Sequence, residues 1–229
     1  MTRTLLLRLA GPQQSWGGPA TQRHRPTEPV PTYGGVLGLL AAALGAPAGE
    51  VPERLRTLEL LVRADRPGAI EQDFHTVSAP PADVAEARQR DYRLRHSAGK
   101  GRADYVVPLG NGMPWVKNTK VQTFISHRAY IADAEFILAA TGPEELIAEL
   151  AAAVRNPVFT PYLGRLAYAP TFPFTLGARD GDGMSVLKAL PTTATGPVKV
   201  YRVTEHATFQ AARIEAPTTA TPLTDWKQP

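Results

Sequence analysis

Cysteine is absent from the sequence. Its absence excludes disulfide bonds, zinc sites with thiolate ligands, thiol nucleophiles and iron–sulfur clusters held by cysteine. Long apolar runs are lacking too: the longest, from Val36 to Ala43, is far shorter than the roughly 20 residues of a membrane-spanning helix. The first residues, MTRTLLLRLAGP, have neither the apolar core nor the cleavage site of a signal peptide. We therefore expect a soluble, cytoplasmic protein with no membrane partner.

Motifs of metal-dependent or covalent catalysis are also lacking. No G-x-S-x-G nucleophile elbow occurs, and no acidic pair has the local context of a metal or glycosidase site. An isolated histidine is more often a hydrogen-bonded structural residue than a metal ligand. No H-x-x-x-H or similar ligand pair is formed by the five histidines, His24, His75, His96, His127 and His206. The sequence thus shows no motif of metal-dependent or covalent catalysis, and we expect no metal ion and no other cofactor.

The composition that remains is that of a folded domain with a small excess of positive charge. Hydrophobic residues make up 43% of the chain and charged residues 20%, which is enough apolar surface for a buried core. A length of 229 residues suits one large domain, or one domain with a sizeable insertion. The formal net charge of +4 only mildly favours an anionic partner. The local distribution of charge is therefore more informative than its sum.

Regular elements are predicted on either side of an irregular middle segment. Alternating or continuous apolar residues predict strands at Leu5–Leu9, Thr57–Arg63, Phe74–Val77, Ala134–Ala140, Val198–Val203 and Phe209–Ile214. One helix is predicted between Thr32, an N-cap residue, and Gly45, a C-terminal stop.

A second helix is predicted in the segment TGPEELIAELAAAVRNP, with Thr141 and Glu144 as a capping box, Pro143 in its first turn and its end at Asn156-Pro157. This order of elements fits an α+β fold of the ferredoxin-like, RNA-recognition type. We expect a single domain spanning residues 1–229, with a long insertion at about residues 78–120.

The middle segment carries the densest positive charge of the chain. Residues 88–102, RQRDYRLRHSAGKGR, contain six cationic residues and one aspartate, a local net charge of +5. Tyr92 is interleaved with the arginines, and an RNA-binding segment needs cations for phosphates and a ring for a base. We predict RNA contacts for Arg88, Arg93 and Arg95. The alternative, a solvated charged loop, stays open.

A second candidate lies just after the first predicted strand, in the loop GPQQSWGG. Its glycines allow backbone N–H groups to approach an anion, Gln13 and Gln14 can read base edges, and Trp16 can stack on a base. The basic, proline-rich stretch that follows adds Arg23 and Arg25 to the predicted RNA contacts. The alternative is an ordinary loop whose tryptophan packs into the core, because no phosphate-binding motif is present.

Two further short motifs combine cations with aromatic or histidine residues. His127 and Arg128 precede the predicted strand at Ala134–Ala140, and the sequence PYLGR places Tyr162, Gly164 and Arg165 in one turn. A guanidinium can bind phosphate bidentately, a tyrosine ring can stack on a base, and a glycine lets the backbone approach RNA closely. The alternative is a core tyrosine and an arginine paired with a surface carboxylate.

Five blocks of the sequence, in order, resemble one known family. The blocks are RLAGPQQSWG, RPTEPVPTYGGVLGLLAAALG, QDFHTV, SHRAYIADAEF and NPVFTPYLGRLAYAPTFPFTLG. They are similar to the CasD family of type I-E CRISPR Cascade complexes, which belongs to the fifth Cas family and the RAMP superfamily. The resemblance covers about residues 3–177 and becomes weaker toward the end.

The resemblance implies a modified RNA-recognition fold with a projecting β-hairpin thumb, which falls on the basic segment at about residues 78–120. It implies a non-catalytic subunit that binds the 5′ handle of the guide RNA (crRNA) and caps one end of the backbone filament. The implied protein partners are a CasC-type backbone subunit, a CasA-type large subunit and, through the complex, the other Cascade subunits. The family's handle-binding positions map onto the GPQQSWG loop, Arg128 and the Tyr162–Arg165 turn. The segment on which the thumb falls is longer and richer in proline and glycine than the resemblance leads one to expect.

Two other functions remain open on the residues alone. The first is a metal-independent endoribonuclease that processes CRISPR repeat RNA, for which His127, His24, Tyr33 and Lys117 have suitable acid, base and cationic groups. The second is a generic module that binds single-stranded RNA, which explains the charge but not the ordered blocks.

Overall fold

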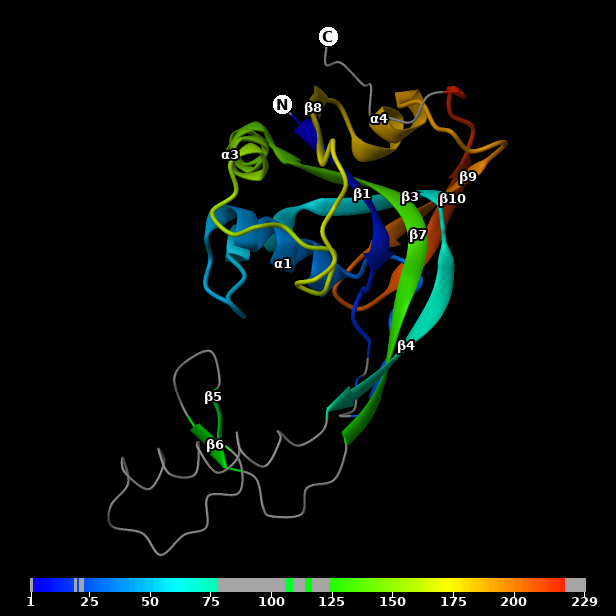
Figure 1. Ribbon diagram of the computed structural model, residues 1–229. Helices are drawn as coiled ribbons and strands as arrows, with labels where there is room; N and C mark the ends of the chain where they lie inside the picture. Colours follow the sequence, from blue (N-terminus) through cyan, green and yellow to red (C-terminus); the bar gives the residue numbers. More distant parts are fainter. Residues whose placement is uncertain are drawn as a thin grey trace, which may run out of the picture. The chain divides into compact units, whose positions relative to one another are not determined.

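The computed structural model, drawn in Figure 1, describes residues 2–18, 20, 23–77, 106–108, 114–116 and 124–220. The chain forms two compact units, one of Met1–Asp73 with His127–Pro229, and one of Phe74–Ser126. In the second unit, β5 (Val106–Pro108) pairs with β6 (Pro114–Val116) in an antiparallel ladder. The basic stretch with Arg88, Arg93 and Arg95 lies outside the described residues.

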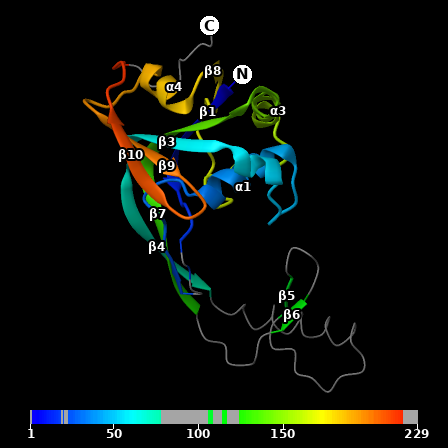
Figure 2. The same cartoon turned by 180° about the vertical axis from the view of Figure 1, so that it is seen from behind.

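An eight-stranded sheet organises the first unit, and its main path runs β10-β9-β3-β7-β1-β8. All five strand pairings along this path are antiparallel. Two more strands, β2 and β4, lie off the path and pair with β7. Figure 2 shows β9 and β10 from behind, alongside β3. The strands are β1 (Thr2–Gln14), β2 (His24–Arg25), β3 (Glu59–Arg66), β4 (Ala69–Val77), β7 (Phe124–Pro143), β8 (Thr175–Asp180), β9 (Val198–Val203) and β10 (Thr208–Ile214).

The sheet is buried on both faces, because its strands carry apolar side chains on alternate sides. In β1, Leu5 and Leu7 join the core under α1 (Tyr33–Leu44) and α3 (Glu144–Arg155), whereas Leu6 joins a second core under α4 (Gly183–Ala189). A period of two residues sends successive side chains to opposite faces, which explains why β1 reads as a nearly continuous apolar run. The predicted α+β class is confirmed.

Helix α1 begins and ends at the predicted residues. The Thr32 side chain accepts a hydrogen bond from the Gly35 N–H, and Gly45 closes the helix with a φ of 84°. A Cβ on Gly35 would lie 2.9 Å from the Trp16 ring, so the close approach of that ring requires this glycine.

The start of α3 differs from the prediction of a capping box. Pro143 is the N-cap residue, and no side chain caps the helix. The Thr141 hydroxyl is instead 2.8 Å from the Thr4 hydroxyl of β1, because Thr141 still belongs to β7 and is buried there. The predicted end at Asn156 is confirmed.

Several other element boundaries also differ from those predicted. Residues Glu53–Thr57 form a 3-10 helix, η1, before β3 begins at Glu59, and β7 is 20 residues long. Strand β8 and helix α4 were not predicted, because both are short and lie in a glycine-rich stretch.

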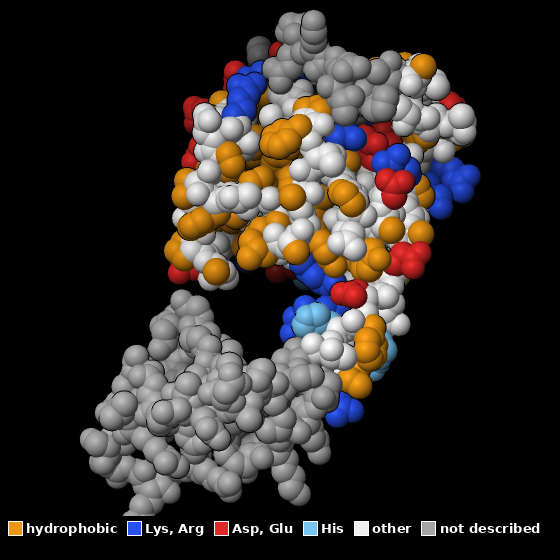
Figure 3. Space-filling model, in the orientation of Figure 1, with side chains coloured by type: hydrophobic (Ala, Val, Ile, Leu, Met, Phe, Trp, Pro, Cys, Tyr) orange, Lys and Arg blue, Asp and Glu red, His pale blue; other side chains and the backbone are white. Residues whose placement is uncertain are grey.

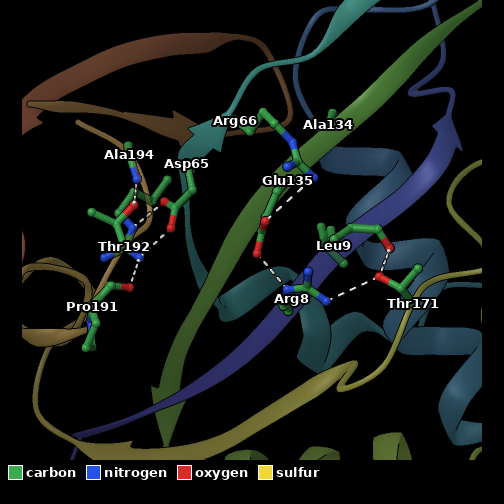
Figure 4. A network of polar contacts seen from close by, with 12 residues as sticks. Arg8, Leu9, Asp65, Arg66, Ala134, Glu135, Thr171, Pro191, Thr192 and Ala194 are labelled. Carbon is green, nitrogen blue, oxygen red and sulfur yellow. Dashed lines mark hydrogen bonds and ion pairs between the residues drawn. The ribbon is translucent and has the colours of Figure 1, made fainter. Parts of the chain in front are cut away.

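Two buried ion pairs are formed by residues of the sheet, and Figure 4 shows the one between Arg8 and Glu135. The Arg8 Nε lies 2.6 Å from Glu135 Oε1 and joins β1 to β7. Arg63, fully buried, pairs with Asp65 and donates to the backbone carbonyls of Leu187 and Leu190 at the end of α4. Burial raises the pKa of the Asp65 carboxyl, and the hydrogen bonds from Arg63 offset part of this rise.

No helix in the described part of the chain is both long enough and apolar enough to cross a membrane.

Candidate nucleic-acid interface

A short parallel pairing between β2 and β7 brings two predicted RNA-binding arginines together. Arg25 lies opposite Arg128, and His24 lies opposite His127, with the two imidazole rings stacked at a centroid distance of 5.3 Å and an interplanar angle of 8°. The His127 N–H donates to the Arg23 carbonyl at 2.7 Å, which fixes the start of β2 against β7. Arg23 and Arg25 are exposed and Arg128 is half-buried.

Arg165 reaches the same place from the connector, residues 156–174, which joins α3 to β8. Its Nη2 donates to the Ala129 carbonyl of β7 at 2.8 Å and to the Arg25 carbonyl of β2 at 3.4 Å. Its Nη1 donates to the Tyr168 hydroxyl at 2.9 Å, and the guanidinium carbon is 5.5 Å from the centre of that ring. We call Arg23, Arg25, Arg128 and Arg165 the cationic cluster.

The cationic cluster carries charge that no carboxylate of the described residues neutralises. Its four arginines make no ion pair within the described part of the chain, and Arg165 is bound only by neutral oxygens there. The Arg128 Nε is buried and has no hydrogen-bond partner among the described residues. Ion pairs with carboxylates are made elsewhere in this unit by Arg3, Arg54, Arg56, Arg66 and Arg202. Four close arginines without a carboxylate are suited to an anionic ligand with several phosphates.

The structure corrects the prediction that Gln14 and Trp16 contact RNA bases. Both side chains are at most 1% exposed. The Gln14 amide donates to the carbonyls of Leu9 and Ala134 and accepts from the Trp16 indole N–H, at distances of 2.8–3.0 Å. The donors and acceptor are used within the protein, so neither side chain presents an edge or a face to a ligand. Gln13 is half-buried in β1 opposite Ala132 of β7.

Within the PYLGR turn, the residues have different surroundings. Tyr162 is 40% exposed and is available for stacking. Gly164 has a φ of 91°, and a Cβ placed on it would lie 1.5 Å from the Ser15 carbonyl oxygen. The close approach that requires a glycine here is therefore to the protein's own backbone. The alternative of a carboxylate partner for Arg165 is wrong for the described residues, because its acceptors are carbonyls and a hydroxyl.

Sequence reasoning missed the groups that hold the cationic cluster in place. The Tyr168 ring and hydroxyl orient Arg165, and the Ala129 carbonyl anchors it to β7. The spacing of three residues between Arg165 and Tyr168 was the only local signal for this pair. No group of three or more potential metal ligands occurs among the residues that the structure describes.

Comparisons with known proteins agree on one family. The model of the family described as CRISPR-associated protein (Cas_Cas5) matches residues 4–223. The "CRISPR system Cascade subunit CasD" of Escherichia coli (strain K12) is 35% identical over 180 residues, which are 77% of this chain and 71% of that protein.

Two solved structures are also similar. A chain of a "CRISPR RNA-guided surveillance complex" has a TM-score of 0.67 and 30% identity, over 93% of this chain and 91% of that one. A chain titled "Crystal structure of Cas protein" has a TM-score of 0.58 and 27% identity, over 92% and 91% of the two chains.

Proposed function

Since this chain belongs to the Cas5 family of CRISPR-associated proteins, we propose that it is the non-catalytic subunit of a type I-E surveillance complex that holds the 5′ handle of the guide RNA. In this role it caps one end of the backbone filament, beside a CasC-type backbone subunit and a CasA-type large subunit. The fold is then a modified RNA-recognition fold, and residues at about 78–120 form its thumb, with Arg88, Arg93 and Arg95 as further RNA contacts.

The cationic cluster is the observation that carries this proposal. Arg25 and Arg128 lie opposite each other on paired strands, where two like charges destabilise a sheet. An RNA backbone offers phosphates at short intervals, and each can neutralise one guanidinium through charge-assisted hydrogen bonds. Tyr162, on the same connector as Arg165, supplies an exposed ring for a base.

Binding of handle RNA to the purified chain tests this proposal. We expect preference for the repeat-derived handle over a scrambled RNA of equal length. For a single strand, each phosphate contact contributes about −0.7 to the slope of log K against log salt, so the four arginines of the cationic cluster alone contribute about −3. Arg128→Ala should weaken binding by about 1–3 kcal/mol and reduce the slope by about 0.7.

Arg56→Ala is the matched control, because Arg56 lies on the same unit but pairs with Glu53 and Glu205. It should bind RNA like the wild type. Equal affinity for handle and scrambled RNA, or equal effects of Arg56→Ala and Arg128→Ala, would contradict a handle site at the cationic cluster.

Incubation of the same RNA with the protein, with and without divalent metal, tests the absence of catalysis. We expect no cleavage. The stacked pair of His24 and His127 is the feature that an endoribonuclease would use here. Cleavage that His127→Ala abolishes, with RNA binding retained, would replace the proposed function by the endoribonuclease.

A further inference from the structure

The connector displays a concentration of exposed apolar side chains. Five of the nine large hydrophobic side chains that are exposed in the described part of the chain belong to residues 156–174. One of them, Tyr162, has a hydroxyl and is assigned above to RNA. We call the other four the connector surface: Val158 (65% exposed), Phe159 (50%), Leu166 (82%) and Phe172 (82%). A concentration of exposed apolar side chains on a folded protein is typical of an interaction site.

Hydrogen bonds hold the connector backbone to the rest of the unit. The Val158 N–H donates to the Ala43 carbonyl at the end of α1, at 3.1 Å, and the Thr171 N–H donates to the Ala10 carbonyl of β1, at 2.8 Å. Leu163, near the middle of the connector, is fully buried. The exposed side chains therefore project from a fixed backbone, which lowers the entropic cost of ordering the segment in a complex.

The distribution of charge on this face favours a protein over a nucleic acid. Arg165 is the only charged residue from 156 to 174, and its guanidinium donates to carbonyls of β2 and β7. Figure 3 shows hydrophobic side chains grouped over α1 and the connector, with charged side chains toward the edges of that face. An apolar centre with a charged rim is the pattern of protein interfaces, which are rich in aromatic residues and poor in charge at their core. RNA phosphates, in contrast, require cations.

We propose that the connector surface is a docking site for an apolar patch of a neighbouring protein subunit in the same ribonucleoprotein complex. The inference rests on the proposed function for the existence of that complex. It adds a second site, separate in chemistry from the cationic cluster: the arginines bind the guide RNA, and the aromatic and aliphatic side chains of the connector bind protein.

Substitution of matched phenylalanines tests the proposal. Phe159 is 50% exposed on the connector, and Phe209 is 49% exposed on the edge strand β10. The chain is co-expressed with the other protein subunits and the guide RNA of its complex, and its recovery on a tag carried by another subunit is measured. We expect Phe159→Asp and Phe172→Asp to lower recovery at least about tenfold, as loss of an aromatic anchor does. Phe209→Asp should lower it less than about twofold.

Two measurements on the isolated chain separate the possible results. Thermal unfolding shows whether each variant is folded, and handle RNA binding shows whether the cationic cluster is intact. Both should match the wild type, because the substituted side chains are 49–82% exposed. Loss of RNA binding in parallel with loss of assembly would overturn the proposal in favour of an RNA-contacting surface. Recovery of the connector variants at the wild-type level would overturn it too.

Hydroxyl-radical footprinting of the wild type provides a test that needs no variant. Phe159, Leu166 and Phe172 should be oxidised in the isolated chain and protected in the complex. Equal oxidation in both states would overturn the proposal. A wild-type chain that neither binds handle RNA nor enters the complex would instead overturn the proposed function, so the two failures are distinguishable.

Discussion

Replacement of Gly164 by alanine separates two explanations of this glycine: contact with RNA and contact with the protein backbone. The φ of 91° alone costs an alanine about 1–2 kcal/mol. The new Cβ would also lie 1.5 Å from the Ser15 carbonyl oxygen, whereas real Cβ contacts are essentially never under 3.0 Å. The turn must therefore move by about the difference between these two distances.

That movement affects groups that stabilise the fold. The Ser15 N–H donates to the Leu163 carbonyl at 3.0 Å, and Leu163 is fully buried. Loss of the hydrogen bond costs about 1 kcal/mol, and partial loss of the leucine's packing adds about 1–2 kcal/mol. We expect Gly164→Ala to lower the free energy of unfolding by about 3–5 kcal/mol. For a chain of this length, that corresponds to a fall in Tm of about 6–20 °C.

Gly196→Ala is the control, because Gly196 has the same φ of 91° but no described atom within 4 Å of an added Cβ. It should lower the free energy of unfolding only by the cost of the positive φ, about 1–2 kcal/mol. Denaturant unfolding of the wild type and both variants, followed by circular dichroism, gives the two differences. Equal losses in the two variants would refute the reasoning from the Ser15 contact. A stable Gly164→Ala protein that no longer binds handle RNA would show that this glycine faces the RNA.

The remaining predictions concern a buried amide and a helix cap. Gln14→Ala should lower the free energy of unfolding by about 2–4 kcal/mol, because two carbonyls and the Trp16 indole N–H lose their partner in a dry environment. RNA affinity of the folded fraction should not change; a stable variant with weakened RNA binding would restore the base-reading role.

The Asp182 carboxyl accepts hydrogen bonds from the side chain and the backbone N–H of Ser185 at the start of α4, and these bonds lower its pKa below the ordinary 3.8. Its stabilisation is therefore present above pH 3.8 and is lost as the pH falls through the lowered pKa. Asp182→Ala should cost about 0.5–1 kcal/mol at neutral pH and progressively less in acid, whereas Asp182→Asn should keep most of the cap. A pH-independent difference between Asp182→Ala and the wild type would contradict this assignment.

Elements with strong local signals could be predicted from the sequence. The cap residues Thr32 and Gly45 bound α1 in the structure, and the predicted strand Val198–Val203 coincides with β9. In each case the deciding residues lie within the element or directly beside it. The predicted capping box of α3 is wrong because the Thr141 hydroxyl is hydrogen-bonded to the hydroxyl of Thr4, which is 137 positions away in the sequence. The residues next to Thr141 in the sequence carry no information about such a distant hydrogen-bond partner.

The candidate site shows the same difference between what local residues predict and what distant contacts decide. The sequence predicted its cationic residues, but not which of them are neighbours. Arg25 and Arg128 meet through two residues of parallel pairing between segments about a hundred residues apart, and nothing local to either segment encodes that pairing. Gln14 was misassigned for a related reason. Its burial depends on the Ala134 carbonyl, 120 positions away, and a polar loop sequence gives no sign of it.

Because Arg25 and Arg128 lie opposite each other, the stability of this fold is lower than it could be. Selection for stability alone would replace one arginine by glutamate and turn a repulsion across paired strands into an attraction. The same replacement would lower the net charge of the cationic cluster by two and so weaken its attraction for an anion. Sequences designed or evolved only for a higher melting temperature should therefore lose arginine at one of these positions. Retention of arginine at both positions would indicate that function requires the two charges although they lower the stability of the fold.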